Sequence, residues 1–314
     1  MSGDLFPAVL LRREDITPEV TLFEFGPELG RTLPSFTAGS HIRVEVADGL
    51  IRSYSLNNDE AEKNRYIIAV KREENGRGGS LGMHRNLRPG ARVHISSPQN
   101  FMPVVPAERY LLIAGGIGIT PIISILRKLQ REGHTNWHLI YLVRNHSQAA
   151  YLSELMSEEL RDRVTIHASD DAGYFDFWPY VQKQAAAHLY YCGPKSMMDA
   201  LYALTIHWPR SHIHYEEFSG GTLSKAGNLP FRVRRAGSDE VIEIPAEESV
   251  VEVFRRLGYK PKSSCETGTC RTCIVGLIAG KADHRDLCLS TAERSHCFAP
   301  CVSRALGEEL TLEI

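Results

Sequence analysis

The sequence contains a compact cysteine cluster, SSCETGTCRTC, at residues 263–273. Within it, Cys265, Cys270 and Cys273 have the spacing C-x4-C-x2-C, which is typical of three thiolate ligands of a plant-type [2Fe–2S] cluster whose fourth ligand lies further along the chain. A loop can wrap three sulfur atoms around a cluster only if its backbone turns tightly, and Gly268 allows such a turn. The spacing therefore predicts an iron–sulfur site.

Three later cysteines could supply the fourth ligand: Cys288, Cys297 and Cys301. Cys301 is favoured because it follows a proline and lies nearest to the predicted last strand. The alternatives to an iron–sulfur cluster are a zinc site or unrelated buried thiols. Zinc loops usually combine two close cysteine pairs, and no second close pair in the sequence fits well.

Two glycine-rich turns have the composition of phosphate-binding loops. GGIGITP, at residues 115–121, follows an apolar strand and leads into a helix, so backbone amides and the helix N-terminus could hold an anion. Pro121 stands where the dinucleotide fingerprint has its third glycine. NGRGGSLGMHRNL, at residues 75–87, places Gly79 and Ser80 at the start of a short helix. The alternatives are an ordinary strand-to-helix turn and a surface hairpin loop.

A third candidate is RSYSLNN, at residues 52–58. In a strand, Arg52 and Tyr54 share one face and Ser53 and Ser55 share the other. An arginine beside an aromatic ring could hold a phosphate and stack on a planar group, whereas the alternative is an ordinary strand. Together these stretches and the cysteines predict two phosphate sites and a metal cluster in three modules.

Residues 1–104 must form the module that carries RSYSLNN and the second glycine turn. Short β-like runs at 20–25, 41–56 and 65–71 alternate with turn residues and lack long helical patterns between them. This organisation predicts an antiparallel β-barrel or sandwich.

Residues 105–220 alternate strands with helices. The predicted strands are 109–114, 138–144, 164–168 and 188–192, and helices are predicted after GGIGITP, at 151–160 and at 195–206. In the first helix, Thr120 is the predicted N-cap and Pro121 the first helical residue. The alternation predicts a parallel, doubly wound α/β sheet.

The rest of the chain is predicted to form a linker and a third domain. Residues 219–228 are rich in Gly and Ser and poor in apolar side chains, which is typical of a flexible linker. We place the linker at 221–228 and the third domain at 229–314. This domain contains a predicted hairpin at 231–245, a helix at 249–258, the cysteine loop and a strand at 309–314.

Composition excludes several classes of partner. The net charge is −2, with 43% hydrophobic and 24% charged residues, so we expect neither nucleic-acid binding nor attraction to an anionic membrane. The first residues lack the pattern of a signal peptide, and no uninterrupted apolar run is long enough to span a membrane. We therefore expect a cytoplasmic protein with reduced cysteines.

The motifs RSYSLNN, IIAVKREENGRGGS, IAGGIGITPIISIL, YYCGP, YEEF, CETGTCRTC and CVSRA occur in this order. With them the chain resembles, over essentially its whole length, the phthalate dioxygenase reductase family, the reductase components of Rieske non-haem iron oxygenases within the ferredoxin–NADP reductase superfamily. The resemblance implies an antiparallel β-barrel domain that binds FMN, an α/β parallel-sheet domain that binds a nicotinamide dinucleotide, and an α+β (β-grasp) plant-type ferredoxin domain.

The resemblance also implies roles for individual residues. The residues implied to line the FMN are Arg52, Ser53, Tyr54, Ser55, Ala69, Lys71, Gly79, Ser80, Thr120 and Phe218. Those implied to face the dinucleotide are Gly115, Gly116, Gly118, Cys192, Gly193 and Pro194. Ser55, Cys192 and Phe218 would form the immediate environment of the reacting flavin. The motif CVSRA selects Cys301 as the fourth ligand, which leaves Cys288 and Cys297 as ordinary thiols.

The choice of dinucleotide rests mainly on the resemblance, which favours NADH. Asp170 or Asp171, after the strand predicted at 164–168, could bond ribose hydroxyls and repel a 2′-phosphate. Arg144 lies in the same domain and could receive that phosphate instead. We therefore include Arg144 and Asp170 among the candidate dinucleotide residues.

A mismatch in electron number predicts the order of electron transfer. NADH donates two electrons as a hydride, a [2Fe–2S] cluster accepts one at a time, and a flavin can do both. We expect electrons to pass from NADH to FMN, to the cluster, and then to a Rieske non-haem iron oxygenase component, foremost an aromatic-acid dioxygenase such as phthalate dioxygenase. The alternatives are an FAD-dependent reductase that serves another metalloprotein, and a non-catalytic redox sensor. No acid–base pair is required, and a monomer is expected.

Arg271 is unusual in the cysteine loop, because family loops commonly have glycine or another small residue there. An arginine at this position needs a permissive backbone conformation, and its side chain should point outward. It is either a solvated surface residue or a charge that raises the cluster potential or pairs with an acidic patch on the oxygenase.

Overall fold

The computed structural model describes residues 5–47, 50–74, 78–184, 186–218, 228–263, 266, 268, 271–286 and 288–314. The predicted ligands Cys265 and Cys270, and nearly all of the predicted linker, lie outside these residues. The chain divides into two compact units, Met1–Phe218 and Ser219–Ile314.

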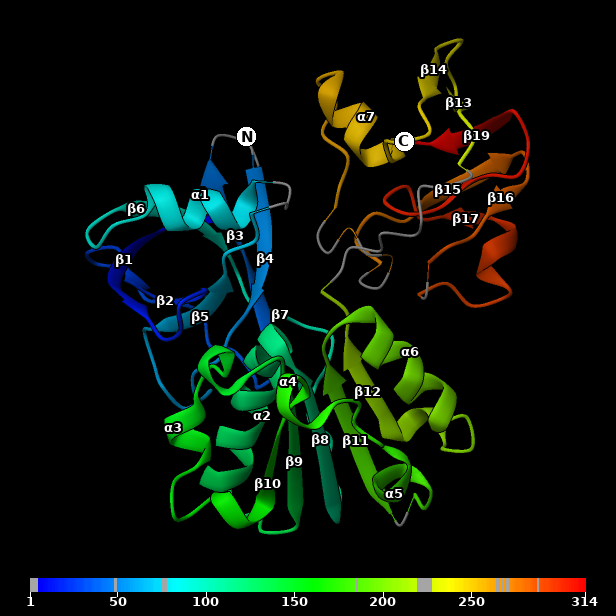
Figure 1. Cartoon of the computed structure of the whole chain (residues 1–314). Coiled ribbons are helices and arrows are strands. Elements are labelled where there is room, and N and C mark those ends of the chain that lie inside the picture. Colours follow the sequence, from blue (N-terminus) through cyan, green and yellow to red (C-terminus); the bar gives the residue numbers. More distant parts are fainter. Residues whose placement is uncertain are drawn as a thin grey trace. The chain divides into compact units, whose positions relative to one another are not determined.

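The N-terminal part of the first unit is an antiparallel barrel (Figure 1). Its strands, in the order β4-β3-β6-β1-β2-β5, are β1 (Leu5–Asp15), β2 (Val20–Pro27), β3 (Ser40–Ala47), β4 (Leu50–Ser55), β5 (Tyr66–Lys71) and β6 (Arg92–Ser96), and β7 (Gln99–Asn100) pairs with β3. A bridge between Leu56 and Ile68 brings the two ends of this order together. Helix α1 (Gly79–Asn86) adds Met83 to the barrel core. The barrel predicted from the sequence is confirmed.

The second part of the first unit is a five-stranded parallel sheet in the order β10-β9-β8-β11-β12. The strands are β8 (Arg109–Gly115), β9 (Trp137–Val143), β10 (Val164–Ala168), β11 (Ala187–Cys192) and β12 (Ile213–Glu216). From β8 the chain continues to β9 and β10 on one side, and it then crosses to the other side of β8 to form β11 and β12. The strand order therefore reverses between β8 and β11. The carboxyl ends at such a reversal are where open α/β sheets bind ligands.

Helices cover both faces of this sheet (Figure 1). Helices α2 (Ile119–Arg131) and α3 (Leu152–Leu155) contribute to one core, and α5 (Trp178–Val181) and α6 (Lys195–Leu204) contribute to the other. Helix α4 (Ser169–Ala172) and the 3₁₀ turns η1 (Gly116–Gly118), η2 (His146–Gln148), η3 (Arg161–Arg163) and η4 (Arg210–His212) complete the connections. The parallel, doubly wound sheet is confirmed.

Three local predictions in this domain were wrong or incomplete. Helix α2 begins at Ile119 because η1 runs directly into it, so Thr120 is not the N-cap, and Pro121 sits third, where the first turn still tolerates a missing N–H. The helix predicted at 151–160 is reduced to α3, after which the chain turns through a bond from Ser157 N to Glu154 O of 3.2 Å. The sequence patterns also missed β12 as a strand.

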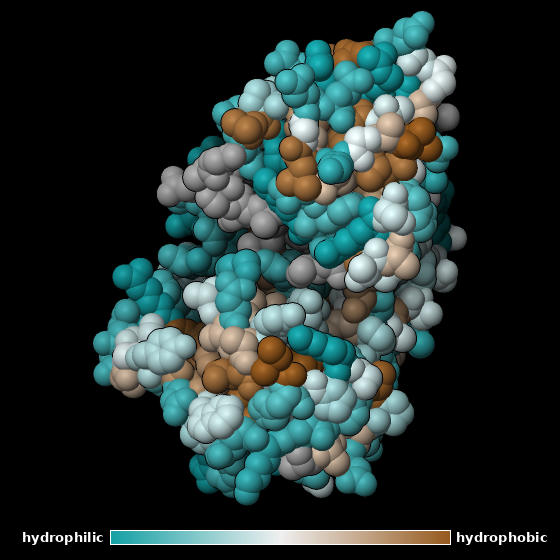
Figure 2. All heavy atoms as spheres, turned by 90° about the vertical axis from the view of Figure 1, so that its right-hand side faces the viewer, coloured by the Kyte–Doolittle hydropathy of each residue, from teal (hydrophilic) through white to brown (hydrophobic). Residues whose placement is uncertain are grey.

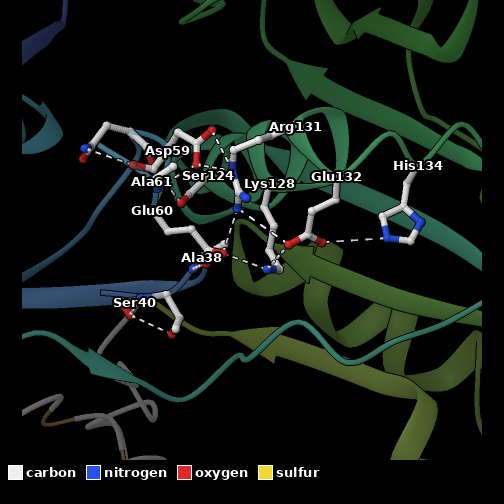
Figure 3. Close-up of polar contacts among 12 residues, drawn as sticks. Ala38, Ser40, Asp59, Glu60, Ala61, Ser124, Lys128, Arg131, Glu132 and His134 are labelled. Atoms are coloured by element: carbon white, nitrogen blue, oxygen red, sulfur yellow. Dashed lines mark hydrogen bonds and ion pairs between the residues drawn. The ribbon is translucent and has the colours of Figure 1, made fainter. Parts of the chain in front are cut away.

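Ionic contacts join α2 to the barrel segment after β4 (Figure 3). Lys128 Nζ and Arg131 NH2 lie 2.7 and 2.8 Å from Oε1 of Glu60, and Arg131 Nε lies 3.0 Å from Oδ1 of Asp59. Glu60 also accepts a hydrogen bond from the backbone N–H of Ala38 at 2.7 Å. Its side chain is only 15% exposed, so these contacts are stronger than typical surface ion pairs. They hold the barrel and the parallel sheet in a defined arrangement.

The second unit contains a mixed sheet in the order β14-β13-β19-β15-β17. Its elements are β13 (Phe231–Arg235), β14 (Val241–Ile244), α7 (Val250–Arg256), β15 (Val275–Ala279), β16 (Ala282–Asp283), η5 (Glu293–Ser295), β17 (Cys297–Phe298), β18 (Arg304–Ala305) and β19 (Glu309–Glu313). Ser249 and Glu252 form a capping box at the start of α7. Strands β13 and β19 are parallel and the other pairs in this sheet are antiparallel. The hairpin, helix and last strand predicted from the sequence are confirmed.

The surface is mainly hydrophilic on the face shown in Figure 2, where hydrophobic residues form small separate groups. In the part of the chain that the structure describes, no helix is both long and apolar enough to cross a membrane.

Candidate flavin, nicotinamide and cluster sites

Two turns meet at the carboxyl ends of β8 and β11, where the strand order reverses. A Cβ added to Gly118 would lie 2.2 Å from the carbonyl oxygen of Cys192, and one added to Gly115 would lie 2.6 Å from Cδ of Pro194. Likewise, a Cβ on Gly193 would lie 3.0 Å from the backbone of Gly115. The structure therefore brings the predicted dinucleotide residues together. It also shows that Gly115 and Gly118 are needed for the close packing of the two turns.

Gly116 differs from its neighbours in this turn. Its φ is +53°, and no heavy atom lies within 4 Å of a Cβ built on it. The left-handed conformation favours glycine, and the open side of Gly116 leaves backbone room for a phosphate or ribose. The 3₁₀ turn η1 also packs against β5, the barrel strand that carries Ala69 and Lys71.

The side chain of Cys192 is fully enclosed at the end of β11. It is 0% exposed, and burial together with the nearby Glu216 and Glu217 carboxylates raises the pKa of its thiol. The thiol therefore remains protonated near neutral pH and is not a nucleophile. In the predicted site, the Cys192 side chain therefore serves to fill space where the two turns meet.

Two residues absent from the sequence predictions, His41 and Glu216, complete this junction. Ser55 Oγ donates to Oε2 of Glu216 at 3.0 Å, and Nδ1 of His41 lies 3.6 Å from Oε1 of the same carboxylate. His41 and Ser55 belong to the barrel, whereas Glu216 ends β12 of the parallel sheet. The signal in the sequence was the motif YEEF, which was used for the resemblance alone.

The predicted phosphate region of the flavin site combines β4 with the start of α1. The side chain of Arg52 passes over Gly79, where an added Cβ would lie 2.6 Å from Arg52 Cγ and 2.9 Å from its Nε. Ser53 Oγ is buried and has no hydrogen-bond partner among the described residues. A buried hydroxyl of this kind needs a partner, but Ser53 lies on the face of β4 opposite Arg52. The arginine and the helix N-terminus beside it fit an anionic ligand such as a flavin phosphate.

The other predicted flavin residues lie near this region in different environments. Tyr54 packs against the barrel core, and burial raises the pKa of its hydroxyl. Ser80 Oγ accepts a hydrogen bond from Glu73 N at 3.1 Å. Lys71 Nζ lies 2.9 Å from Glu73 Oε1 and 3.8 Å from Glu19 Oε2, so its charge is already partly neutralised. Thr120 is buried and donates to the carbonyl of Ile117 at 3.0 Å.

Arg144 and Asp170 meet beyond the ends of β9 and β10. Nε of Arg144 lies 3.5 Å from Oδ1 of Asp170, and the backbone N–H of Asp170 donates to the Arg144 carbonyl at 2.9 Å. Both side chains are exposed, at 75% and 48%. The arrangement presents a carboxylate and a guanidinium together at the same edge as the two glycine turns. Phe218, predicted to stack on the flavin, is 37% exposed after β12.

In the second unit, two predicted cluster ligands lie side by side. The Sγ atoms of Cys273 and Cys301 are 3.3 Å apart, in a small core that also contains Val251 and Ala299. Two buried thiols this close fit a shared metal centre. They also favour Cys301 over Cys288 and Cys297, which lie part-exposed.

Gly268 is one of the described residues of the predicted cysteine loop. Gly268 has φ +79°, and a Cβ there would lie 2.7 Å from Val302 and 3.0 Å from Asp286, so glycine is required for both conformation and space. The left-handed conformation is consistent with the tight turn predicted there. Cys265 and Cys270 remain predicted ligands, because they lie outside the described residues.

Arg271 also has a left-handed backbone conformation, with φ +64°. Its guanidinium donates to the Cys288 carbonyl and forms an ion pair with Glu293. Hydrogen bonds from Arg271 and then from Ser290 lower the pKa of Glu293 to about 2. Arg271 is therefore engaged within its own domain, and these contacts offset the cost of a non-glycine residue at this conformation.

Three family models match successive parts of the chain. An oxidoreductase FAD-binding domain matches residues 7–102, a ferric reductase NAD-binding domain matches 107–168, and a 2Fe-2S iron–sulfur cluster binding domain matches 233–306.

Individual relatives extend this similarity to the whole chain. The phthalate dioxygenase reductase of Burkholderia cepacia is 42% identical over 96% of this chain and 95% of its own length. The phthalate 4,5-dioxygenase oxygenase reductase subunit of Pseudomonas putida is 40% identical over 97% of this chain and 95% of its own.

Solved structures show the same relationship. A structure of phthalate dioxygenase reductase, described as modular for electron transfer from pyridine nucleotides to [2Fe–2S], covers 99% of this chain and 98% of its own at 41% identity, with a TM-score of 0.81. An intact type IV self-sufficient cytochrome P450 monooxygenase contains a similar region, which covers 99% of this chain and 41% of that protein at 31% identity and a TM-score of 0.78. The chain therefore belongs to the phthalate dioxygenase reductase family and is an NAD(P)H-dependent oxidoreductase with flavin and [2Fe–2S] domains, the reductase component of an oxygenase.

Proposed function

We propose that this protein oxidises NADH with a bound FMN and passes single electrons through its [2Fe–2S] cluster to the oxygenase component of a Rieske system. The similarity to two phthalate oxygenase reductases along nearly the whole chain supports this proposal most strongly. An aromatic-acid dioxygenase is accordingly the first partner to test. We divide the chain into a flavin domain at 1–104, an NAD domain at 105–220, a linker at 221–228 and a ferredoxin domain at 229–314.

The residues of the first unit have binding and orienting tasks in this reaction. The flavin would supply two-electron acceptance and one-electron donation. Arg52 and the start of α1 with Gly79 and Ser80 would hold its phosphate, and the two glycine turns would hold the dinucleotide at the reversal of strand order. The closed packing of Cys192 would exclude water from the point of transfer.

In the second unit, Cys273 and Cys301 would hold the cluster together with Cys265 and Cys270. The 3.3 Å separation of the first two sulfur atoms supports this assignment. We propose a reducing, cytoplasmic location, because a cysteine cluster of this spacing is more typical of a metal site than of disulfides. We propose a monomer.

NADH is the proposed donor because Asp170 lies at the dinucleotide edge of the sheet. Arg144 is paired with that carboxylate, which reduces its ability to attract a 2′-phosphate. The test is the ratio of kcat/KM for NADH and NADPH in reduction of a dye. We expect NADH to be favoured at least tenfold, and Asp170→Asn to narrow the ratio. An equal ratio in the unmodified protein would contradict the assignment.

The flavin and the acceptor require separate tests. Chromatography of the flavin released from purified protein should identify FMN, and FAD would contradict that part of the proposal. Purified Rieske oxygenases for phthalate and for other aromatic acids should then be compared as acceptors under single-turnover conditions. The best acceptor should turn over with this reductase and NADH, and failure with all of them would overturn the proposed partner class.

A second candidate partner is a haem protein. The similar region within the self-sufficient cytochrome P450 monooxygenase favours this possibility. A cytochrome P450 included in the same acceptor series distinguishes the two: reduction of the haem protein with no reduction of the Rieske proteins would support the second candidate.

A further inference from the structure

His41 lies where the barrel meets the parallel sheet, at a position for which the sequence predicted no function. It is the register partner of Ser55 in the β3–β4 ladder, so the two side chains lie side by side on one face of the barrel sheet. Both residues are only 3% exposed. The imidazole also packs on Phe101, with ring centroids 5.3 Å apart. Its position is therefore defined from two sides.

His41 and Ser55 contact the two oxygens of a single carboxylate. Ser55 Oγ donates to Oε2 of Glu216 at 3.0 Å, and His41 Nδ1 lies 3.6 Å from Oε1. Glu216 ends β12 and is the register partner of Cys192 at the end of β11. Two barrel side chains thus hold a carboxylate of the parallel sheet, next to the turn that is proposed to contact the nicotinamide.

We propose that His41 is a positioning residue for hydride transfer, acting through Glu216 on Ser55 and on the carboxyl end of β11. The Glu216 side chain is 18% exposed, so it needs polar partners to offset its lost hydration. Ser55 provides a hydrogen-bond donor to this carboxylate, and the His41 imidazole lies against its other oxygen, with Nδ1 3.6 Å away, beyond hydrogen-bond distance but within the range of an ion pair. Without the imidazole, the carboxylate is free to turn away from Ser55, and the two domains lose a shared contact at the transfer point. This inference rests on the proposed function in one respect, the use of NADH as the donor.

The test is single-turnover reduction of the bound flavin by NADH in the full-length protein, followed anaerobically by flavin absorbance. We expect His41→Leu to lower the limiting rate about 10- to 100-fold, as expected for a displacement near reacting groups. The apparent Kd for NADH should change less than about threefold, because the contact with dinucleotide is not removed. His41→Asn keeps a donor at the position of Nδ1 and should stay within about threefold of the unmodified rate.

His94→Leu is the matched control. His94 lies on β6 of the same barrel, 48% exposed, with Nδ1 3.2 Å from Oε2 of Glu45. The same substitution there removes a histidine–carboxylate contact away from the domain junction and should leave the rate of flavin reduction unchanged. An equal loss in His94→Leu and His41→Leu would assign the effect to the barrel as a whole and overturn the proposal.

A double-substitution series separates positioning from simple destabilisation. If His41 acts through Glu216, then His41→Leu combined with Glu216→Gln should be no slower than Glu216→Gln alone. Additive losses, or a His41→Asn variant as slow as His41→Leu, would overturn the proposal. If His41→Leu fails to retain flavin, His41→Ala takes its place in the same series, because alanine also removes the imidazole. Lack of flavin reduction by NADH in the unmodified protein would refute the proposed function, whereas a normal rate in His41→Leu would refute only the role of His41.

Discussion

Gly118→Ala tests whether the two glycine turns must pack backbone against backbone. Gly118 has φ −62° and ψ −6°, a conformation that alanine adopts freely, so the substitution introduces no backbone strain of its own. The added Cβ would lie 2.2 Å from the carbonyl oxygen and 2.5 Å from the carbonyl carbon of Cys192. Because these are backbone atoms, no side-chain rotation can relieve the contact.

The size of the effect follows from the required movement. The segment Cys192–Gly193 must shift by about 1 Å to restore ordinary van der Waals distances, and overpacking of this kind costs about 1–3 kcal/mol in unfolding free energy. A misplacement of about 1 Å near reacting groups can cost about 100-fold in rate. We therefore expect a large loss of NADH-dependent flavin reduction with a moderate loss of stability.

The assay combines anaerobic stopped-flow flavin reduction with urea denaturation. Gly133→Ala is the control, because Gly133 follows α2 with φ +73° and has no atom within 4 Å of an added Cβ. That variant should lose about 1 kcal/mol from its left-handed conformation and keep the unmodified rate. A Gly118→Ala protein with normal stability and normal flavin reduction would refute the reasoning about the two turns.

Three further predictions follow from charge and protonation. Glu60→Gln should lower the unfolding free energy of the first unit by about 1–2 kcal/mol at neutral pH. Burial alone would raise the pKa of Glu60, but its contacts with Lys128 and Ala38 hold the pKa below the ordinary 4.5. Urea titrations should therefore show the loss of stability above that pH and not in stronger acid, and a loss constant with pH would contradict this reasoning. Burial, with His188 and His212 nearby, lowers the pKa of His214 to about 4, so the unfolded chain takes up the proton first as the pH falls. The unfolding free energy should therefore drop by about 1–2 kcal/mol between pH 6.5 and 4, after allowance for solvent screening. In thermal unfolding, His214→Phe should lose less stability over this pH range, and an unchanged loss would exclude His214 as its source. Arg271→Gly should lower the midpoint potential of the cluster and Glu293→Gln should raise it, because each substitution removes one charge of the ion pair. In redox titrations the potential of the double variant should lie closer to that of the unmodified protein than either single variant does. Identical potentials in all four proteins would show that the ion pair does not influence the cluster.

Residue patterns along the chain indicated the kinds of site and much of the architecture. They predicted the doubly wound sheet and an antiparallel barrel or sandwich for the first domain, because strand and helix periodicity reflects burial on one face or two. The choice of a barrel and the ferredoxin-like fold of the third domain came from the family resemblance. The spacing of Cys265, Cys270 and Cys273 predicted the cluster, since a metal centre imposes ligand types and distances that are visible along a single loop. A tight turn at Gly268 is predicted from the same constraint, and its φ of +79° is one that glycine adopts readily.

Contacts between distant residues came from the tertiary structure. Cys301, favoured from the sequence as the fourth ligand, lies beside Cys273 across 28 residues of sequence, whereas the contact of His41 with Glu216 across two domains has no local pattern. Gly115 and Gly118 are predicted to face the dinucleotide, and the structure adds that they allow two turns to pack together. Arg271 likewise has its partner in Glu293, beyond the cysteine loop. Contacts between segments far apart in the chain depend on how elements pack, and for that reason sequence spacing alone did not reveal them.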